Sequence, residues 1–120
     1  MRLIKYICYI FRCKPGQLRA ILSIAENRQF LDMKLKMKHL EFYTNHLKEN
    51  RKVDYFSLST RTADTQYAYN GFMGITVSQH MYSRHRKILK HANLPCVMEL
   101  KGEEGKHIDY WPLEVLVVYF

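Results

Sequence analysis

The spacing of apolar residues changes along this chain, and that change constrains the fold more than any other feature. Near the N-terminus apolar side chains recur at helical intervals, which predicts an apolar helix over about residues 2–12. The Lys-Pro-Gly triplet at 14–16 interrupts it, and Pro15 can occupy the first turn of a second helix. The apolar stripe of that second helix consists of Leu18, Ile21, Leu22 and Ala25.

From residue 31 the apolar interval falls to two. Leu31, Met33, Leu35 and Met37 alternate with aspartate or lysine, which predicts a strand, and a slip of phase before Leu40 suggests a β-bulge. A helix that continues to Met37 is the alternative, because lysine-rich repeats also favour helices. Residues 45–52 are polar and predict the loop of a hairpin, followed by strands over 53–60 and 65–69.

A helix interrupts these strands. The Asn-Gly pair at 70–71 and Gly74 predict a turn before it. Thr76 and Gln79 have the spacing of a capping box, so the helix should begin at Val77 and run to about Ile88.

The buried face of this helix is expected to consist of Val77, Met81, the aliphatic stem of Arg84 and Ile88. At about 100° per residue, His80 and His85 fall on opposite borders of that face. Side chains at such borders are half-buried, so the two histidines could line the mouth of a pocket.

The remaining segments predict strands. Pro95–Leu100 forms one, a charged turn covers 101–105, and Leu113–Phe120 forms the last. The expected fold is therefore α+β: N-terminal helices, then a small OB-like or SH3-like β-barrel with an inserted α/β element. We expect a helical lead-in over residues 1–30 and one domain over residues 31–120.

The charge balance favours a phosphate-bearing partner. The 120 residues carry 19 Lys and Arg against 11 Asp and Glu, for a net charge of +8. Nucleic acid fits this balance, although a basic membrane-surface protein would show the same excess. The N-terminal apolar run is too short to cross a membrane, and three cysteines without CxxC spacing predict reduced thiols.

No pattern in the sequence points to catalysis. A Ser/His/Asp order, a glycine-rich phosphate loop and paired carboxylates are all missing from the sequence. His80, His85 and His91 are a poor metal set, because the first two diverge by about 140° around a helix. We therefore expect a protein that is not an enzyme and has no metal or cofactor.

Three ordered blocks carry a family resemblance. Residues 76–85 read TVSQHMYSRH, residues 89–96 read LKHANLPC, and residues 110–115 read YWPLEV. They resemble the T-V-x-Q-Y-F-x-x-K-Y, L-K-Y-P-x-L-P-C and Y-L-P-L-E-V blocks of the Argonaute PAZ domain. Residues 40–43 and 60–67, LEFY and TRTADTQY, resemble that domain's first strand and its T-R-x-P-A-x-x-x-T-F segment.

The resemblance implies a module of RNA silencing that holds the 3′ end of a small single-stranded guide RNA. Aromatic rings would stack on the terminal nucleotides, and basic groups would hold their phosphates. The residues that the resemblance assigns to RNA binding are Tyr55, Tyr67, Tyr69, His80, Arg84, His85, Lys90, Tyr110 and Trp111. It also implies other Argonaute domains in a longer protein, a cytoplasmic or nuclear location, and no membrane.

The helix block departs from the family pattern. His80 and His85 replace two tyrosines, Arg84 replaces a lysine and Met81 replaces a phenylalanine. Histidine still stacks and hydrogen-bonds, but it titrates near pH ~6.5, which predicts RNA binding that strengthens as pH falls from about 8 to 6. The alternative is that the pocket has decayed and the domain serves a structural or protein-interaction role.

Overall fold

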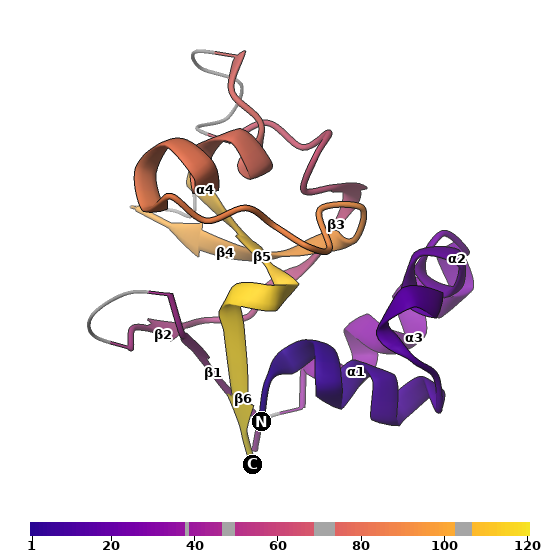
Figure 1. Cartoon of the computed structure of the whole chain (residues 1–120). Helices are drawn as coiled ribbons and strands as arrows, with labels where there is room; N and C mark the ends of the chain where they lie inside the picture. Colours follow the sequence, from indigo (N-terminus) through magenta and orange to yellow (C-terminus); the bar gives the residue numbers. More distant parts are fainter. Residues whose placement is uncertain (38, 47–49, 69–73, 103–106) are drawn as a thin grey trace.

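The computed structural model describes residues 1–37, 39–46, 50–68, 74–102 and 107–120 (Figure 1). Its elements, in chain order, are α1 (Leu3–Phe11), η1 (Pro15–Gln17), α2 (Leu18–Leu22), α3 (Ala25–Leu35), β1 (Glu41–Thr44), β2 (Lys52–Val53), β3 (Ser57–Thr62), α4 (Val77–His85), β4 (Pro95–Lys101), β5 (His107–Pro112), η4 (Leu113–Val115) and β6 (Leu116–Tyr119). The predicted α+β class is confirmed.

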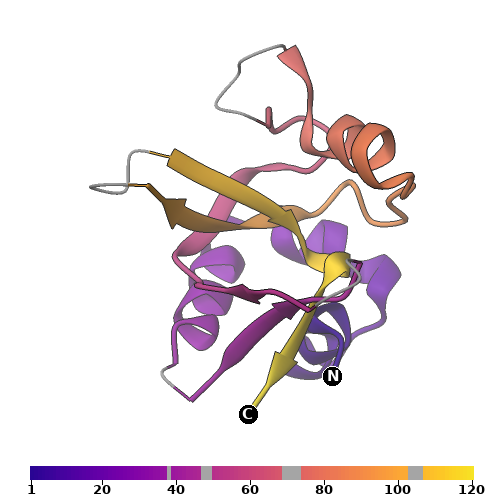
Figure 2. The ribbon, with the colours of Figure 1, turned by 90° about the vertical axis from the view of Figure 1, so that its left-hand side faces the viewer.

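The described strands form two antiparallel sheets of three strands each, in the orders β2-β1-β6 and β3-β4-β5. Figure 2 shows the second sheet lying across the first, with α4 at one end of it and α1–α3 behind. Within the described residues the two sheets stay separate and do not close into the barrel that the sequence predicts.

The strand predicted over residues 53–60 is wrong as a single element, because it is split between the sheets. Val53 pairs with Phe42 of β1, whereas Leu58 pairs with Val97 of β4. Between them the backbone N–H of Asp54 donates a 2.7 Å hydrogen bond to the carboxylate of Glu99. A side chain that is distant in sequence thus takes the place of a strand partner for the backbone N–H of Asp54.

Residues 25–35 form α3, so the strand predicted from residue 31 is wrong and the helical alternative is confirmed as far as Leu35. Leu31 and Leu35 are spaced i,i+4 and buried, whereas Met33 is 72% exposed on another face. Asp32 and Lys36 add an i,i+4 ion pair of 2.9 Å. The strand β1 begins only at Glu41, so the position of the expected bulge, before Leu40, precedes the strand. The boundary expected at residue 30 lies within α3.

The N-terminal helix and the last strand share one core. Leu3 and Ile7 of α1 are fully buried in the same cluster as Leu116 and Val118 of β6. The backbone of Met1 exchanges hydrogen bonds with Val118, at 2.7 and 3.2 Å. The two ends of the chain therefore lie side by side (Figure 1).

The helix α4 begins as predicted. Thr76 and Gln79 form a reciprocal capping box, with hydrogen bonds of 3.2 and 2.9 Å. The helix ends at His85, before the predicted Ile88, because Arg86 adopts the left-handed conformation at φ 53°. Ile88 is consequently 76% exposed.

The buried face predicted for α4 is confirmed only in part, and the strand predicted before it is wrong. Val77 and Met81 are buried, as predicted, but the side chain of Arg84 is exposed. Instead of the strand predicted over residues 65–69, the described part of that segment forms only a bridge between Tyr67 and Thr76.

The C-terminal segment contains one strand more than the sequence predicts. The predicted strand from Pro95 is β4, and it pairs with β5, whose mixed polar pattern gave no prediction. The strand predicted from Leu113 is wrong in its first three residues, because Leu113–Val115 form the 3₁₀ helix η4. The strand β6 begins only at Leu116. The η4 turn carries the chain from the second sheet to the first (Figure 1).

The helix lengths and the cysteines add two further findings. Within the described ranges, no helix has the length and apolar character needed to cross a membrane. The cysteines Cys8, Cys13 and Cys96 are free thiols, and burial raises the pKa of Cys8 to about 11 and that of Cys96 to about 12.

Candidate functional site

A pocket of about 150 Å³ lies between α4 and β5, the strand at one end of its sheet. The buried i,i+4 pair Val77 and Met81 fixes which face of α4 turns inward, and this places His80 and His85 beside the cavity. We call this site the α4–β5 pocket. Its lining consists of Ala68, Val77, His80, Met81, His85, Ile108, Asp109, Tyr110 and Trp111.

Three histidines form a row beside the pocket. His46, which follows β1, packs edge-on against His85 with ring centroids 4.7 Å apart and planes at 85°. His85 in turn meets His80 edge-on at 5.8 Å. The ring of His46 also lies 6.1 Å from that of Trp111. At His46, the segment that follows β1 of the first sheet is therefore packed against the side of a pocket that belongs to the second.

The environment of His46 disfavours its protonated form. Burial lowers the pKa of His46 to about 4, and the nearby charges of His85 and Lys87 act in the same direction. The carbonyl of Val115 opposes this shift only in part. Within the described residues, both ring nitrogens of His46 are buried, and apart from this contact with Val115 neither has a hydrogen-bond partner.

His80 is shifted in the same direction. Burial lowers its pKa, His85 and Arg84 lower it further, and the carboxylate of Asp109 opposes them. His46 and His80 are therefore both mainly neutral near pH 7. At that pH the two rings add little positive charge, and they offer aromatic faces to a ligand.

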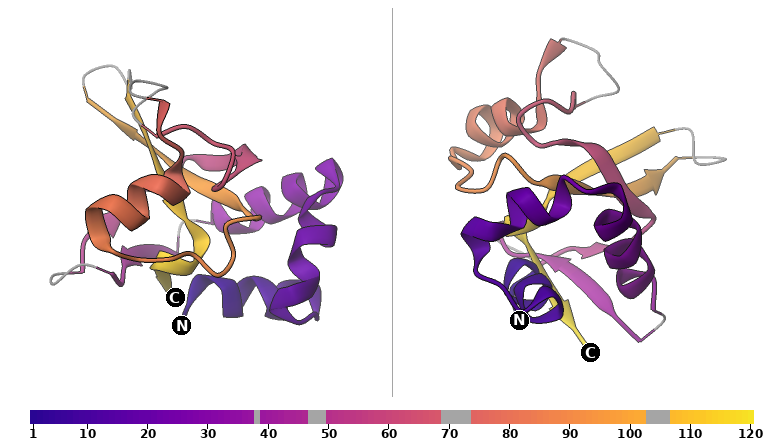
Figure 3. Two further views of the ribbon diagram at one scale, coloured as in Figure 1. Left: turned by 45° about the horizontal axis from the view of Figure 1, so that its top comes forward. Right: turned by 90° about the vertical axis from the view of Figure 1, so that its right-hand side faces the viewer.

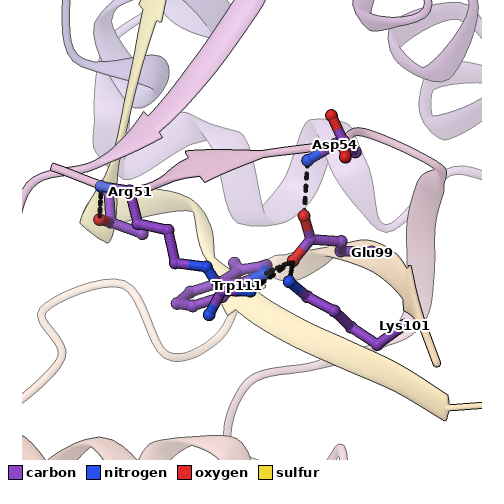
Figure 4. A network of polar contacts seen from close by, with 6 residues as sticks. Arg51, Asp54, Glu99, Lys101 and Trp111 are labelled. Atoms are coloured by element: carbon purple, nitrogen blue, oxygen red, sulfur yellow. Dashed lines mark hydrogen bonds and ion pairs between the residues drawn. The ribbon is translucent and has the colours of Figure 1, made fainter.

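Trp111 is held from two sides, as Figure 4 shows. Its indole N–H donates a 3.3 Å hydrogen bond to Glu99, and the guanidinium of Arg51 lies 5.6 Å from the ring centroid. The backbone N–H of Arg51 is fixed in turn by the hydroxyl of Thr44, at 2.9 Å. Residues from both sheets thus set the orientation of the pocket's indole ring.

The carboxylate of Glu99 organises this network (Figure 4). Glu99 is 2% exposed, and it accepts from Trp111 and from the Asp54 backbone. Lys101 and Arg51 place cationic nitrogens 3.3 and 3.8 Å from it. A buried carboxylate needs such compensation, because an unpaired charge in the interior is strongly unfavourable.

Two polar side chains of β5 complete the lining. Asp109 contributes a carboxylate, which can only accept hydrogen bonds when ionised. Burial raises the pKa of Tyr110, so its phenol stays neutral and can donate. The pocket can therefore offer both an acceptor and a donor to a bound sugar or base.

The structure brings together His80, His85, Tyr110 and Trp111 among the residues predicted to bind RNA. Arg84 is exposed on α4 and Lys90 is exposed after it, and neither is part of the lining. Tyr69 lies outside the described residues.

The remaining predicted residues, Tyr55 and Tyr67, lie elsewhere. The hydroxyl of Tyr55 donates a 2.6 Å bond to Asp32, and its ring stacks on Phe42 at 5.4 Å, so it serves the core. Tyr67 is 43% exposed and bridges to Thr76 before α4, outside the pocket lining.

Sequence reasoning missed His46 and Asp109. His46 falls in a polar segment that predicts only a hairpin loop, and no local pattern reveals that its ring packs against His85 of α4. Asp109 lies between the matched blocks, in a strand that was not predicted. Although the histidines form a row, the described residues hold no group of His, Cys, Asp or Glu that could bind a metal ion.

An α+β domain with two three-stranded sheets, helices at its N-terminus and a capped helix beside an aromatic pocket defines a known fold. The structure is similar to that of the PAZ domain of a Drosophila Argonaute protein, solved in complex with RNA 2′-O-methylated at its 3′ end. The TM-score is 0.71 at 18% identity, covering 97% of this chain and 95% of that one. No protein-family model matches the chain, and no curated protein matches its sequence.

Proposed function

We propose that this chain is an RNA-binding module that holds the 3′-terminal nucleotide of a small single-stranded RNA in the α4–β5 pocket. The observation that carries the proposal is that the pocket has an aromatic lining and a volume that fits one sugar or base ring. Its volume of about 150 Å³ equals that of a cavity that accepts a benzene-sized guest, so it suits one sugar or base ring.

Stacking would supply much of the affinity. Trp111, Tyr110 and the mainly neutral ring of His80 present faces on which a base or ribose can pack. Stacking of one base on an aromatic side chain contributes roughly 1–3 kcal/mol. Because Glu99 and Arg51 already fix the indole ring, little side-chain freedom is lost when a ligand binds.

Phosphate contacts would supply the rest. Arg84 and Arg86 are exposed at the C-terminal end of α4, beside His85 of the pocket, and neither forms an ion pair with another described residue. Such side chains can neutralise phosphates without first breaking an internal ion pair. The net charge of +8 supports the approach of a polyanion.

The likeness in fold supports the same proposal. The Drosophila PAZ domain was solved with RNA modified at its 3′ end, and the present chain superposes on it over nearly its whole length. We extend the proposal to a non-enzymatic role in RNA silencing in the cytoplasm or nucleus, beside other Argonaute domains.

The test compares linear and circular single-stranded RNA of one sequence, with affinity measured by fluorescence anisotropy. The linear RNA should bind more tightly, and His85→Ala should reduce that preference. His107→Ala is the matched control, because this exposed histidine starts β5 and is not part of the pocket lining. Equal affinity for both RNAs would reject end recognition and favour a structural or protein-interaction role for a decayed pocket.

A further inference from the structure

A second concave site lies on the side of the molecule where α1 meets the segment after α4. Its volume is about 370 Å³, and its floor includes the buried residues Ile4 and Cys8. Figure 3 shows the segment that follows α4 passing close to the start of α1. We call this site the basic groove.

Four cationic side chains border the basic groove: Arg2, Lys5, Lys87 and Lys90. In the part of the chain that the structure describes, none of them forms an ion pair. Cations gathered from separate parts of the chain repel one another, which costs stability unless an anion binds between them.

The acidic residue of the basic groove forms no ion pair with these cations in the described part of the chain. Glu114 is part of the lining, but its two carboxylate oxygens accept the backbone N–H groups of Lys90 and His91, at 3.1 and 2.8 Å. Its role is thus to fix the backbone that carries Lys90. The lysine ammonium groups stay available to a ligand.

The basic groove adjoins the α4–β5 pocket along the chain. His85 lines the pocket and Lys87 lines the groove, so their Cα atoms are separated by at most about 7.6 Å, two peptide steps. The charge of Lys87 also reaches His46, which packs on His85. Arg86, which lies between His85 and Lys87 in the sequence, is exposed and adds a further positive charge there.

We propose that the basic groove binds the phosphodiester backbone of the same RNA strand, on the 5′ side of the nucleotide held in the α4–β5 pocket. This inference rests on the proposed function. It predicts that the N-terminal helix takes part in binding and that affinity depends on strand length. A short RNA would reach only the pocket, whereas a longer one would engage both sites.

The experiment compares an oligouridine trinucleotide with a decanucleotide, each with a free 3′ end, on the full chain. The double variant Lys5→Glu with Lys90→Glu should weaken binding of the decanucleotide by about tenfold or more, while trinucleotide binding changes less than about threefold. The dependence of affinity on salt should become shallower by about 0.7 for each phosphate that the variant no longer neutralises.

Arg19→Glu with Lys34→Glu is the matched control, because it makes the same change in charge on α2 and α3, outside both sites. Lys5→Gln with Lys90→Gln is a milder variant in case the first does not fold. An equal loss of affinity in the groove and control variants would overturn the basic groove as a site. Loss of the preference for linear over circular RNA would instead reject only the proposed end recognition.

Discussion

The ring of His46 lies edge-on against the ring of His85, with their centroids 4.7 Å apart. His46 follows the first strand of one sheet, and His85 ends the helix that flanks the other. The contact therefore joins the two halves of the fold at the edge of the α4–β5 pocket. Burial and the neighbouring positive charges lower the pKa of His46, so protonation of His46 weakens this contact.

Stability should fall in mild acid because of His46. Its pKa is lowered from 6.5 to about 4 in the folded state, so the unfolded chain binds more protons between these values. The contribution of His46 is therefore complete above pH ~6.5 and is lost as the pH falls towards ~4. His46→Phe keeps the ring but cannot titrate, and it should flatten the pH dependence of urea denaturation over this range. If His46→Phe and the wild type lose stability in parallel, the burial of this histidine has no such effect.

RNA binding should gain from protonation of the pocket, but at lower pH than the sequence suggests. Burial lowers the pKa of His80, so in the free protein its ring takes up a proton only below the ordinary value of pH ~6.5. A bound phosphate favours that protonated ring. Affinity should therefore rise mainly below that pH. His80→Tyr with His85→Tyr should remove most of the rise in binding isotherms measured across pH. An unchanged profile would show that RNA binding is not linked to protonation of His80.

The carboxylate of Glu99 should be required to hold Trp111. Glu99→Ala leaves the Asp54 N–H and the Trp111 indole N–H without their acceptor, which should cost about 1–3 kcal/mol of unfolding free energy. Glu99→Gln retains one acceptor oxygen and should cost less. Chemical denaturation measures both, and an equal loss of stability would mean that charge rather than hydrogen bonding is what matters.

Substitution of Arg84 should lower RNA affinity, whereas substitution of Met81 should lower stability. Arg84 is exposed, so Arg84→Ala should leave stability nearly unchanged and weaken RNA binding by roughly 1–2 kcal/mol, with a shallower salt dependence. Met81 is buried, and Met81→Ala should cost roughly 2–4 kcal/mol of stability. Titrations at several salt concentrations and denaturation curves give the two quantities. An unaltered salt slope for Arg84→Ala would exclude Arg84 from phosphate binding.

Asp109 should make RNA binding selective for a 3′-hydroxyl over a 3′-phosphate. A carboxylate in the pocket accepts hydrogen bonds from ribose hydroxyls and repels a terminal phosphate. The wild type should prefer a 3′-hydroxyl over a 3′-phosphate, and Asp109→Asn should reduce that preference by about tenfold, mainly by improving binding of the phosphate. Competition between the two RNAs measures the ratio. A ratio that Asp109→Asn leaves intact would place the discrimination elsewhere.

Local sequence signals predicted the elements that local forces determine. The capping pair Thr76 and Gln79 and the buried spacing of Val77 and Met81 predicted α4 and the inward position of its histidines. The strand β4 and the helix α1 followed from periodicity in the same way. These features depend on residues within one or two turns of each other.

The errors occurred where distant contacts decide the structure. Leu31 and Leu35 fit a strand and a helix equally well on spacing alone, and packing against the core selects the helix. The break after Val53 depends on Glu99, which is remote in sequence. The position of His46 likewise depends on its contact with His85 of α4, and no residue near His46 in the sequence indicates that contact.

Trp111 provides the most direct test of RNA binding in the α4–β5 pocket, because it is the only tryptophan in the chain and it lines that pocket. Its intrinsic fluorescence should change saturably when a short single-stranded RNA with a free 3′ end is added. The matching circular RNA should produce little change at the same concentration. Binding of the linear RNA by anisotropy, without any change in Trp111 fluorescence, would contradict the claim that the pocket holds the RNA end.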